Sequence, residues 1–260
     1  MVKLSMSLLA LTIALPFWTV SPVQAQSSSS FARRLRTIFS RPPSSPATNR
    51  PRGASIRSGT CQATNPPLTA LIPVEQTLEG NPIVLGTTTS EYPTLWFYLP
   101  YAITPDRPAE LRREDPDPTD QASVQQRTVL RLTGAPAGVI GLRLPPTEPP
   151  LAINQFYNWI FVVRCDPQDA STNQFVAGSI VRLAVTANLS QQVARSDPNR
   201  RSQFYAEAGI WQEAIAALVE LRRRSPNDSN LAAEWANLLQ SADLNTIVSK
   251  PIVECCESEK

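Results

Sequence analysis

The chain has 260 residues, a formal net charge of +2, 42 % hydrophobic residues and 18 % charged residues, a balance that supports a packed core and excludes a wholly disordered chain. Its 25 prolines disfavour long helical bundles, because proline interrupts helix interiors. The sequence contains no histidine, which excludes every Ser-His-Asp, Cys-His and His-metal mechanism within this chain.

The N-terminus has the pattern of an export signal. The basic Lys3 precedes an apolar run from Leu8 to Val20, and the small residues up to Ala25 predict cleavage before Gln26. This run is shorter than the roughly 20 residues that span a bilayer, and Pro22 argues against the alternative of a buried core helix. We therefore expect a signal peptide over residues 1–25, no transmembrane span in the mature chain, and a location in the periplasm or cell envelope.

The segment 26–60 is basic and poor in apolar residues. It carries seven arginines and no acidic residue, and its few apolar groups do not offset the entropy cost of ordering, so disorder is predicted. One interpretation is attraction to an anionic envelope polymer or lipid surface, to which each arginine contributes about 1 kcal/mol. The alternative, which we favour, is a solvated spacer behind the signal. Nucleic acid is not an expected partner of an exported chain.

Residues 61–190 predict a β-rich domain. Short apolar segments alternate with Pro, Asn, Asp and Gly, and no helical segment separates them. This pattern favours an α+β chain whose main part is an antiparallel β-sandwich of immunoglobulin-like architecture. It does not predict a true immunoglobulin domain, because Trp159 and Cys165 share one predicted strand. The predicted strands are 68–74, 82–88, 94–98, 109–114, 127–132, 139–144, 156–165 and 175–185.

The acidic segment 114–120 lies between two of these strands. Asp115, Asp117 and Asp120 offer oxygen ligands of the kind that calcium prefers, but the segment lacks the glycine and the final glutamate of a calcium loop. A solvated hairpin loop is therefore the favoured interpretation. No metal and no other cofactor is predicted for the chain.

Residues 197–256 predict a small helical unit. Asp197 followed by proline is typical of a helix start, and Gly209 is typical of a helix end. The unit resembles one tetratricopeptide-type helix pair with a capping helix, and it carries Trp211 and Trp235 at apolar positions. The two rings either anchor a bound peptide or, as we favour, join the helices to the β-domain. The predicted helices cover 197–208, 210–224 and a third segment from residue 229.

Four cysteines in an exported chain favour disulfides, because export leads to oxidising conditions. Cys61, Cys165, Cys255 and Cys256 allow three pairings. The favoured hypothesis joins Cys255 or Cys256 to Cys61 or Cys165, which would tie the C-terminal segment to the β-domain. A Cys255–Cys256 bridge is the redox-active alternative, and zinc is disfavoured because C-x-x-C spacing is missing. Residues 257–260 form a short acidic tail.

Several runs of the sequence together resemble a known family. They are Leu-Thr-Ala-Leu-Ile-Pro at 68–73, Glu-Tyr-Pro-Thr-Leu-Trp-Phe-Tyr-Leu-Pro at 91–100, the segment 157–166 with Tyr157 and Trp159, Gly-Ile-Trp at 209–211, and the Cys255-Cys256 ending. From about Cys61 to Cys256 the chain resembles a secreted cyanobacterial family catalogued as domain of unknown function nine-two-eight, with Leu95 where phenylalanine is typical. The resemblance implies export and a cyanobacterial envelope, and it implies no activity, substrate or catalytic residue.

The sequence lacks a glycine-rich phosphate loop, a G-x-S-x-G elbow and an H-E-x-x-H motif, and we assign no catalytic residue. The favoured function is a non-catalytic protein-interaction or structural module that contacts another envelope protein. The alternative is a carbohydrate-binding or carbohydrate-active envelope protein. It rests on Trp96, Tyr98 and Tyr101, whose rings would stack on sugars if they were exposed on a β-scaffold.

Overall fold

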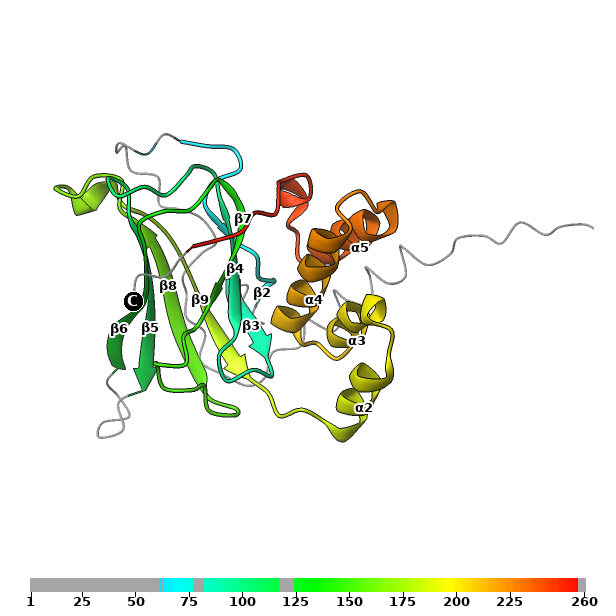
Figure 1. Ribbon diagram of the computed structural model, residues 1–260. Helices are drawn as coiled ribbons and strands as arrows, with labels where there is room; N and C mark the ends of the chain where they lie inside the picture. The colour runs from blue at the N-terminus through cyan, green and yellow to red at the C-terminus, as the bar shows by residue number, and fades with distance from the viewer. Residues whose placement is uncertain (1–60, 62, 77–81, 117–123, 257–260) are drawn as a thin grey trace, which may run out of the picture.

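The computed structural model describes residues 61, 63–76, 82–116 and 124–256 (Figure 1). The predicted signal peptide, the basic segment 26–60, the tip of the acidic loop at 117–123 and the acidic tail 257–260 lie outside these residues. Among the described residues, no helix is both long and apolar enough to cross a bilayer.

The described strands form two sheets. The three-stranded sheet has the order β1-β4-β7, and the six-stranded sheet has the order β2-β3-β9-β8-β5-β6. The small sheet consists of β1 (Thr69–Ala70), β4 (Thr94–Leu99) and β7 (Gly138–Arg143). The large sheet consists of β2 (Val74–Gln76), β3 (Pro82–Thr88), β5 (Ala109–Pro116), β6 (Val124–Leu132), β8 (Phe156–Val163) and β9 (Gln174–Arg182).

The β-rich α+β prediction is confirmed, but two of its details are wrong. The large sheet is mixed rather than antiparallel, because β3 and β9 run parallel, with Leu85 opposite Ser179. After β3 the chain crosses to the small sheet at β4 and re-enters beside β3 only at β9, so no hairpin forces opposite directions. The single strand predicted over 68–74 is two strands in different sheets, separated by a turn that contains Pro73.

The two sheets pack face to face through aromatic rings. Phe97 of β4 stacks on Phe161 of β8 with ring centroids 4.6 Å apart, and it meets Trp159 edge-on at 5.5 Å. All three side chains are buried, and they alternate with more exposed neighbours as the period of two in a strand requires. The core therefore lies between the sheets, where the alternating patterns of 139–144 and 156–165 had placed it.

The helices follow the strands in the chain and gather on one side of them, beside β3 and β4, while β5 and β6 lie on the far side (Figure 1). The helix starting at 197 begins as a 3-10 turn, the break before α4 falls at Gly209 (φ 74°), and α5 begins at Ser229, all close to the prediction. Helix α2 was not predicted, because only Leu189 of its residues is buried and its apolar pattern is weak. The helices are α2 (Ala187–Arg195), α3 (Arg201–Glu207), α4 (Trp211–Arg224) and α5 (Ser229–Ser241), with 3-10 turns at Ala170–Thr172, Pro198–Arg200 and Asn245–Ile247.

Helix α4 is fixed to the strands by its first turn. The indole Nε1 of Trp211 donates a hydrogen bond to the Leu71 carbonyl oxygen (2.7 Å), and the ring is fully buried. The Glu213 carboxylate accepts hydrogen bonds from the Thr88 hydroxyl (2.7 Å) and from the backbone N–H of Ser90 (3.1 Å). Trp211 therefore joins the helices to the sheets, which was the favoured interpretation of this residue.

The C-terminal segment returns to the small sheet. Ile252 forms a parallel bridge with Val139 of β7, and the Val139 N–H donates to the Pro251 carbonyl oxygen at 2.7 Å. Gly138 makes this approach feasible, since a Cβ there would lie 2.8 Å from the Pro251 oxygen, and its φ of 139° is strained for other residues. The chain end thus covers the free edge of β7.

The disulfide pairing differs from the favoured hypothesis. Cys61 pairs with Cys165, with Cα atoms 5.1 Å apart, and Cys255 pairs with Cys256. The C-terminal cysteines are therefore not tied to the β-domain through sulfur. The reason lies in the path of the chain end, which is held at β7 by backbone hydrogen bonds, while Cys61 and Cys165 already lie within bonding distance of each other.

Candidate functional site

The aromatic candidates are largely inside the protein. Trp96 and Tyr98 on β4 are 5 % and 8 % exposed, and Trp211 and Trp235 are fully buried. Tyr101 is half-buried, and its hydroxyl donates to the Gln174 side-chain oxygen at 2.7 Å. Burial raises the pKa of Tyr101 to about 12, against the opposing effect of Arg107 above its ring. Buried rings are not available for stacking on sugars, so the carbohydrate alternative loses the observation that motivated it.

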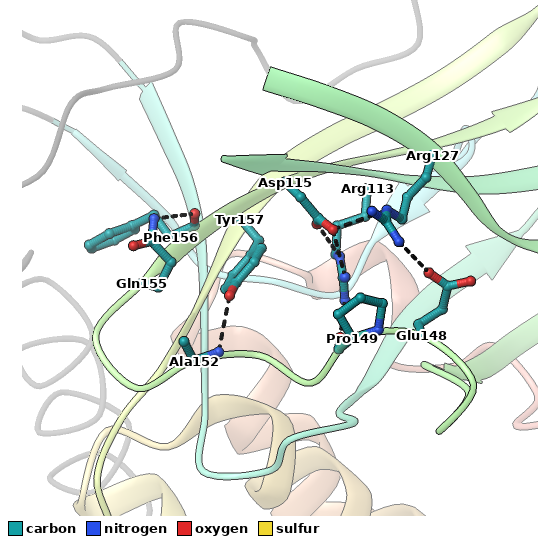
Figure 2. A network of polar contacts seen from close by, with 9 residues as sticks. All are labelled: Arg113, Asp115, Arg127, Glu148, Pro149, Ala152, Gln155, Phe156 and Tyr157. Atoms are coloured by element: carbon teal, nitrogen blue, oxygen red, sulfur yellow. Dashed lines mark hydrogen bonds and ion pairs between the residues drawn. The ribbon is translucent and has the colours of Figure 1, made fainter. Parts of the chain in front are cut away.

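A buried arginine lies on the core-facing side of β5. Arg113 is 2 % exposed, and its guanidinium makes two hydrogen bonds to the Asp115 carboxylate, one of them from NH2 at 2.9 Å (Figure 2). It also donates to the Pro149 carbonyl oxygen at 3.1 Å and lies over the Tyr157 ring, 5.3 Å from its centroid. The side chain is thus satisfied by charge, hydrogen bonds and an aromatic face.

The network around Arg113 continues to a neighbouring strand and loop. Arg127 lies opposite Arg113 on β6, with Nε 3.1 Å from the Asp115 carboxylate and NH1 3.4 Å from Glu148 (Figure 2). The Tyr157 hydroxyl accepts a hydrogen bond from the Ala152 N–H at 3.0 Å. Two positive and two negative side chains balance each other here, and the network attaches the loop at 148–152 to the sheet. We interpret it as structural.

Replacing Arg113 with methionine is expected to lower the free energy of unfolding by about 2 kcal/mol, because the buried Asp115 loses its bidentate partner and keeps only Arg127. The double variant Arg113→Met, Asp115→Leu should recover most of this loss, since it removes both charges. Urea denaturation checks both, with Arg143→Met on exposed β7 as the control that should change stability by less than about 0.5 kcal/mol. A double variant no more stable than the single one would contradict this account.

The outward side of β5 carries a second charged cluster, within a surface pocket. The pocket has a volume of about 490 Å³, and its charged lining residues are Glu110, Arg131 and Arg164. Three prolines from the surrounding turns, Pro105, Pro108 and Pro167, also line it. We call this site the Glu110 pocket. It lies where the loop before β5, the end of β6 and the turn after β8 meet, so its residues come from three separate parts of the chain.

Three arginines surround the Glu110 carboxylate. Arg112 donates to Oε2 from Nε (3.0 Å) and NH2 (2.7 Å), and Arg164 donates to Oε1 from NH2 at 2.9 Å. The Nε atom of Arg131 lies 4.0 Å from Oε1, too far for a hydrogen bond. With three positive charges and one negative charge, the cluster has a net charge of +2.

The charge state of Glu110 follows from these neighbours. Burial acts to raise the pKa of the carboxyl, but the hydrogen bond from Arg112 and the charges of Arg164, Arg112 and Arg131 outweigh it and lower the pKa. Glu110 is therefore ionised at neutral pH. An ionised carboxylate held by two arginine forks shows that this pocket accommodates an oxyanion.

Sequence reasoning missed this pocket as a binding site. Glu110 had been noted only as one carboxylate among several, and the arginines gave no signal because they are separated by up to 52 positions along the chain (112 to 164). The one local clue is the alternation of charged and apolar residues in Glu110-Leu111-Arg112, which puts both charges on one face of β5. In the part of the chain that the structure describes, no group of three Cys, Asp or Glu side chains is arranged to hold a metal ion.

The comparisons with known proteins agree with the resemblance seen in the sequence. The model of the family described as Domain of Unknown Function (DUF928) matches residues 51–252, and no curated protein matches the chain. The matched segment covers the described strands and helices, including the Glu110 pocket. Since it spans more than half of the sequence, the chain belongs to the DUF928 family.

Proposed function

We propose that this chain is an exported cell-envelope protein that acts as a non-catalytic interaction module and contacts an acidic protein of the envelope through the Glu110 pocket. The observation that carries the proposal is the convergence of three arginines on one carboxylate at the surface. We further propose that the two sheets form a sandwich of immunoglobulin-like architecture, an inference supported by the aromatic packing between β4 and β8.

Three features support an interaction role. The signal-like N-terminus favours export, and the disulfide between Cys61 and Cys165 suits an oxidising compartment. The Glu110 pocket has an excess of positive charge, and arginine is the preferred residue for binding carboxylates at interfaces. The basic segment 26–60 has the same sign of charge, so it would add electrostatic attraction to the same acidic partner.

The test is association of the purified mature chain with isolated envelope proteins from the source cells, measured by crosslinking and mass spectrometry at rising salt. We expect one defined acidic protein whose crosslinks map to the surroundings of the Glu110 pocket and weaken with salt, since exposed charges are screened beyond about 10 Å at 0.1 M salt. The double variant Arg131→Ala, Arg164→Ala should lose the crosslinks. Arg143→Ala, Arg195→Ala removes the same charge from exposed sites elsewhere and should keep them.

Two results would overturn this function. One is a mature chain that stays in the cytoplasm with residues 1–25 intact, as shown by fractionation and intact mass. The other is equal crosslinking of the pocket variant and the charge-matched control, which would show that the contact lies elsewhere.

A further inference from the structure

The Glu110 pocket has hydrogen-bond donors that Glu110 does not use. A guanidinium carries five N–H donors in a planar fork. Within the described part of the chain, Arg131 makes one contact, the 4.0 Å approach to Glu110, and its side chain is 69 % exposed. The Nε atom of Arg164 is buried without a hydrogen-bond partner among the described residues, although its NH2 binds Glu110. Donors therefore remain for a second anion.

Glu110 itself shows which chemistry these donors recognise. Both of its oxygens are bound by arginine N–H groups at 2.7 to 3.0 Å, which is the ordinary geometry for a carboxylate. The same fork geometry fits a phosphate group. The proline-lined walls of the pocket are rigid, and its volume of about 490 Å³ leaves room for a small anionic group beside Glu110.

We propose that the Glu110 pocket binds one oxyanion, a carboxylate or phosphate group of an acidic ligand, through Arg131 and Arg164, and that Glu110 competes with this ligand for the two arginines. The inference deepens the proposed function and rests on it for its biological partner. Binding requires Arg131 to turn its exposed fork toward the ligand, while Arg112 holds Glu110 in place from the other side. Glu110 lowers the affinity, because it has the same charge as the ligand and shares its donors.

The experiment is isothermal titration of the purified, oxidised chain with N-acetylglutamate and, separately, with inorganic phosphate. We expect at least one of the two to bind, and the one that binds identifies the source of the oxyanion. Arg131→Ala should weaken that binding about 10- to 100-fold, the loss typical of a hydrogen bond to a charged group. Arg131→Lys should lose less, since it keeps the charge and loses the fork. Arg143→Ala is the control and should bind like the original chain.

Glu110→Gln gives the result of opposite sign. Removing one negative charge about 4 Å from the ligand should tighten binding about fivefold in a solvated pocket. Circular dichroism and thermal melting establish that each variant is folded. The proposal is overturned if neither probe binds, if Arg131→Ala binds as tightly as the original chain, or if Glu110→Gln weakens binding as much as Arg131→Ala does.

This test separates the inference from the proposed function. A chain that binds the small oxyanion but shows no pocket-dependent crosslink in the envelope retains the site and loses the proposed partner. A chain that crosslinks through the pocket but binds neither probe retains the partner and loses the oxyanion mechanism.

Discussion

Replacing Trp211 with alanine is expected to lower the free energy of unfolding by about 3 to 5 kcal/mol, the cost of removing a buried aromatic side chain. The ring is fully buried, and its Nε1 is hydrogen-bonded to the Leu71 carbonyl oxygen at 2.7 Å. Removing it leaves a cavity between α4 and the strands and an unpaired buried carbonyl. Denaturation in urea, followed by circular dichroism, measures the loss.

A pair of conservative variants separates packing from hydrogen bonding. Trp211→Phe keeps most of the buried ring and loses the bond to Leu71, whereas the Nε1 of Trp235 has no hydrogen-bond partner in the described residues. Trp211→Phe should therefore cost about 1 kcal/mol more than Trp235→Phe. Equal losses for the two would show that the Leu71 bond does not contribute, and an unchanged Trp211→Ala chain would refute the joining role of this ring.

The elements with a strong local pattern were predictable. The strand at 82–88 has the predicted bounds, and β7 and β8 follow the alternation of their residues, because one side of each strand faces the aromatic core. Helix α4 was predicted to within one residue, since its apolar residues recur at helical spacing and Gly209 precedes it. In each case the information lies within a few neighbouring residues.

What remained hidden depends on contacts between distant residues. Nothing local indicates that β3 and β9 run parallel, because that pairing is decided by the route of the chain between them. Arg113 lies at a core-facing position of β5 that a periodic pattern assigns to an apolar residue, and it is stabilised there by Asp115 and the Tyr157 ring. The Glu110 pocket has the same character, since its charges come from β5, β6 and the turn after β8.

The disulfide connects this architecture to the pocket. Cys165 follows Arg164 directly in the chain, so the bond to Cys61 constrains the turn that presents the Arg164 guanidinium to Glu110. Arg164 and Cys165 both follow the end of β8, beyond the last ladder pair of β8 with β9. The bond to Cys61 therefore supplies a constraint at a point where the sheet no longer does.

Replacing Cys61 and Cys165 together with serine is expected to lower the free energy of unfolding by about 4 kcal/mol. The bond closes a loop with a sequence separation of 104, and the chain-entropy model gives about 4.7 kcal/mol for a loop of roughly 100 residues. Guanidinium denaturation of the oxidised chain and of the variant measures the difference. Oxyanion binding should weaken in the variant as well, because Arg164 loses the covalent restraint on the neighbouring residue.

The matched control is Cys255→Ser, Cys256→Ser. This pair has a sequence separation of 1, so its bond closes no long loop in the unfolded chain, and its loss should change the unfolding free energy by less than about 1 kcal/mol. Equal destabilisation by the two double variants would contradict the loop-closure argument. A Cys61→Ser, Cys165→Ser chain that is destabilised but binds oxyanions as before would show that the sheet alone positions Arg164.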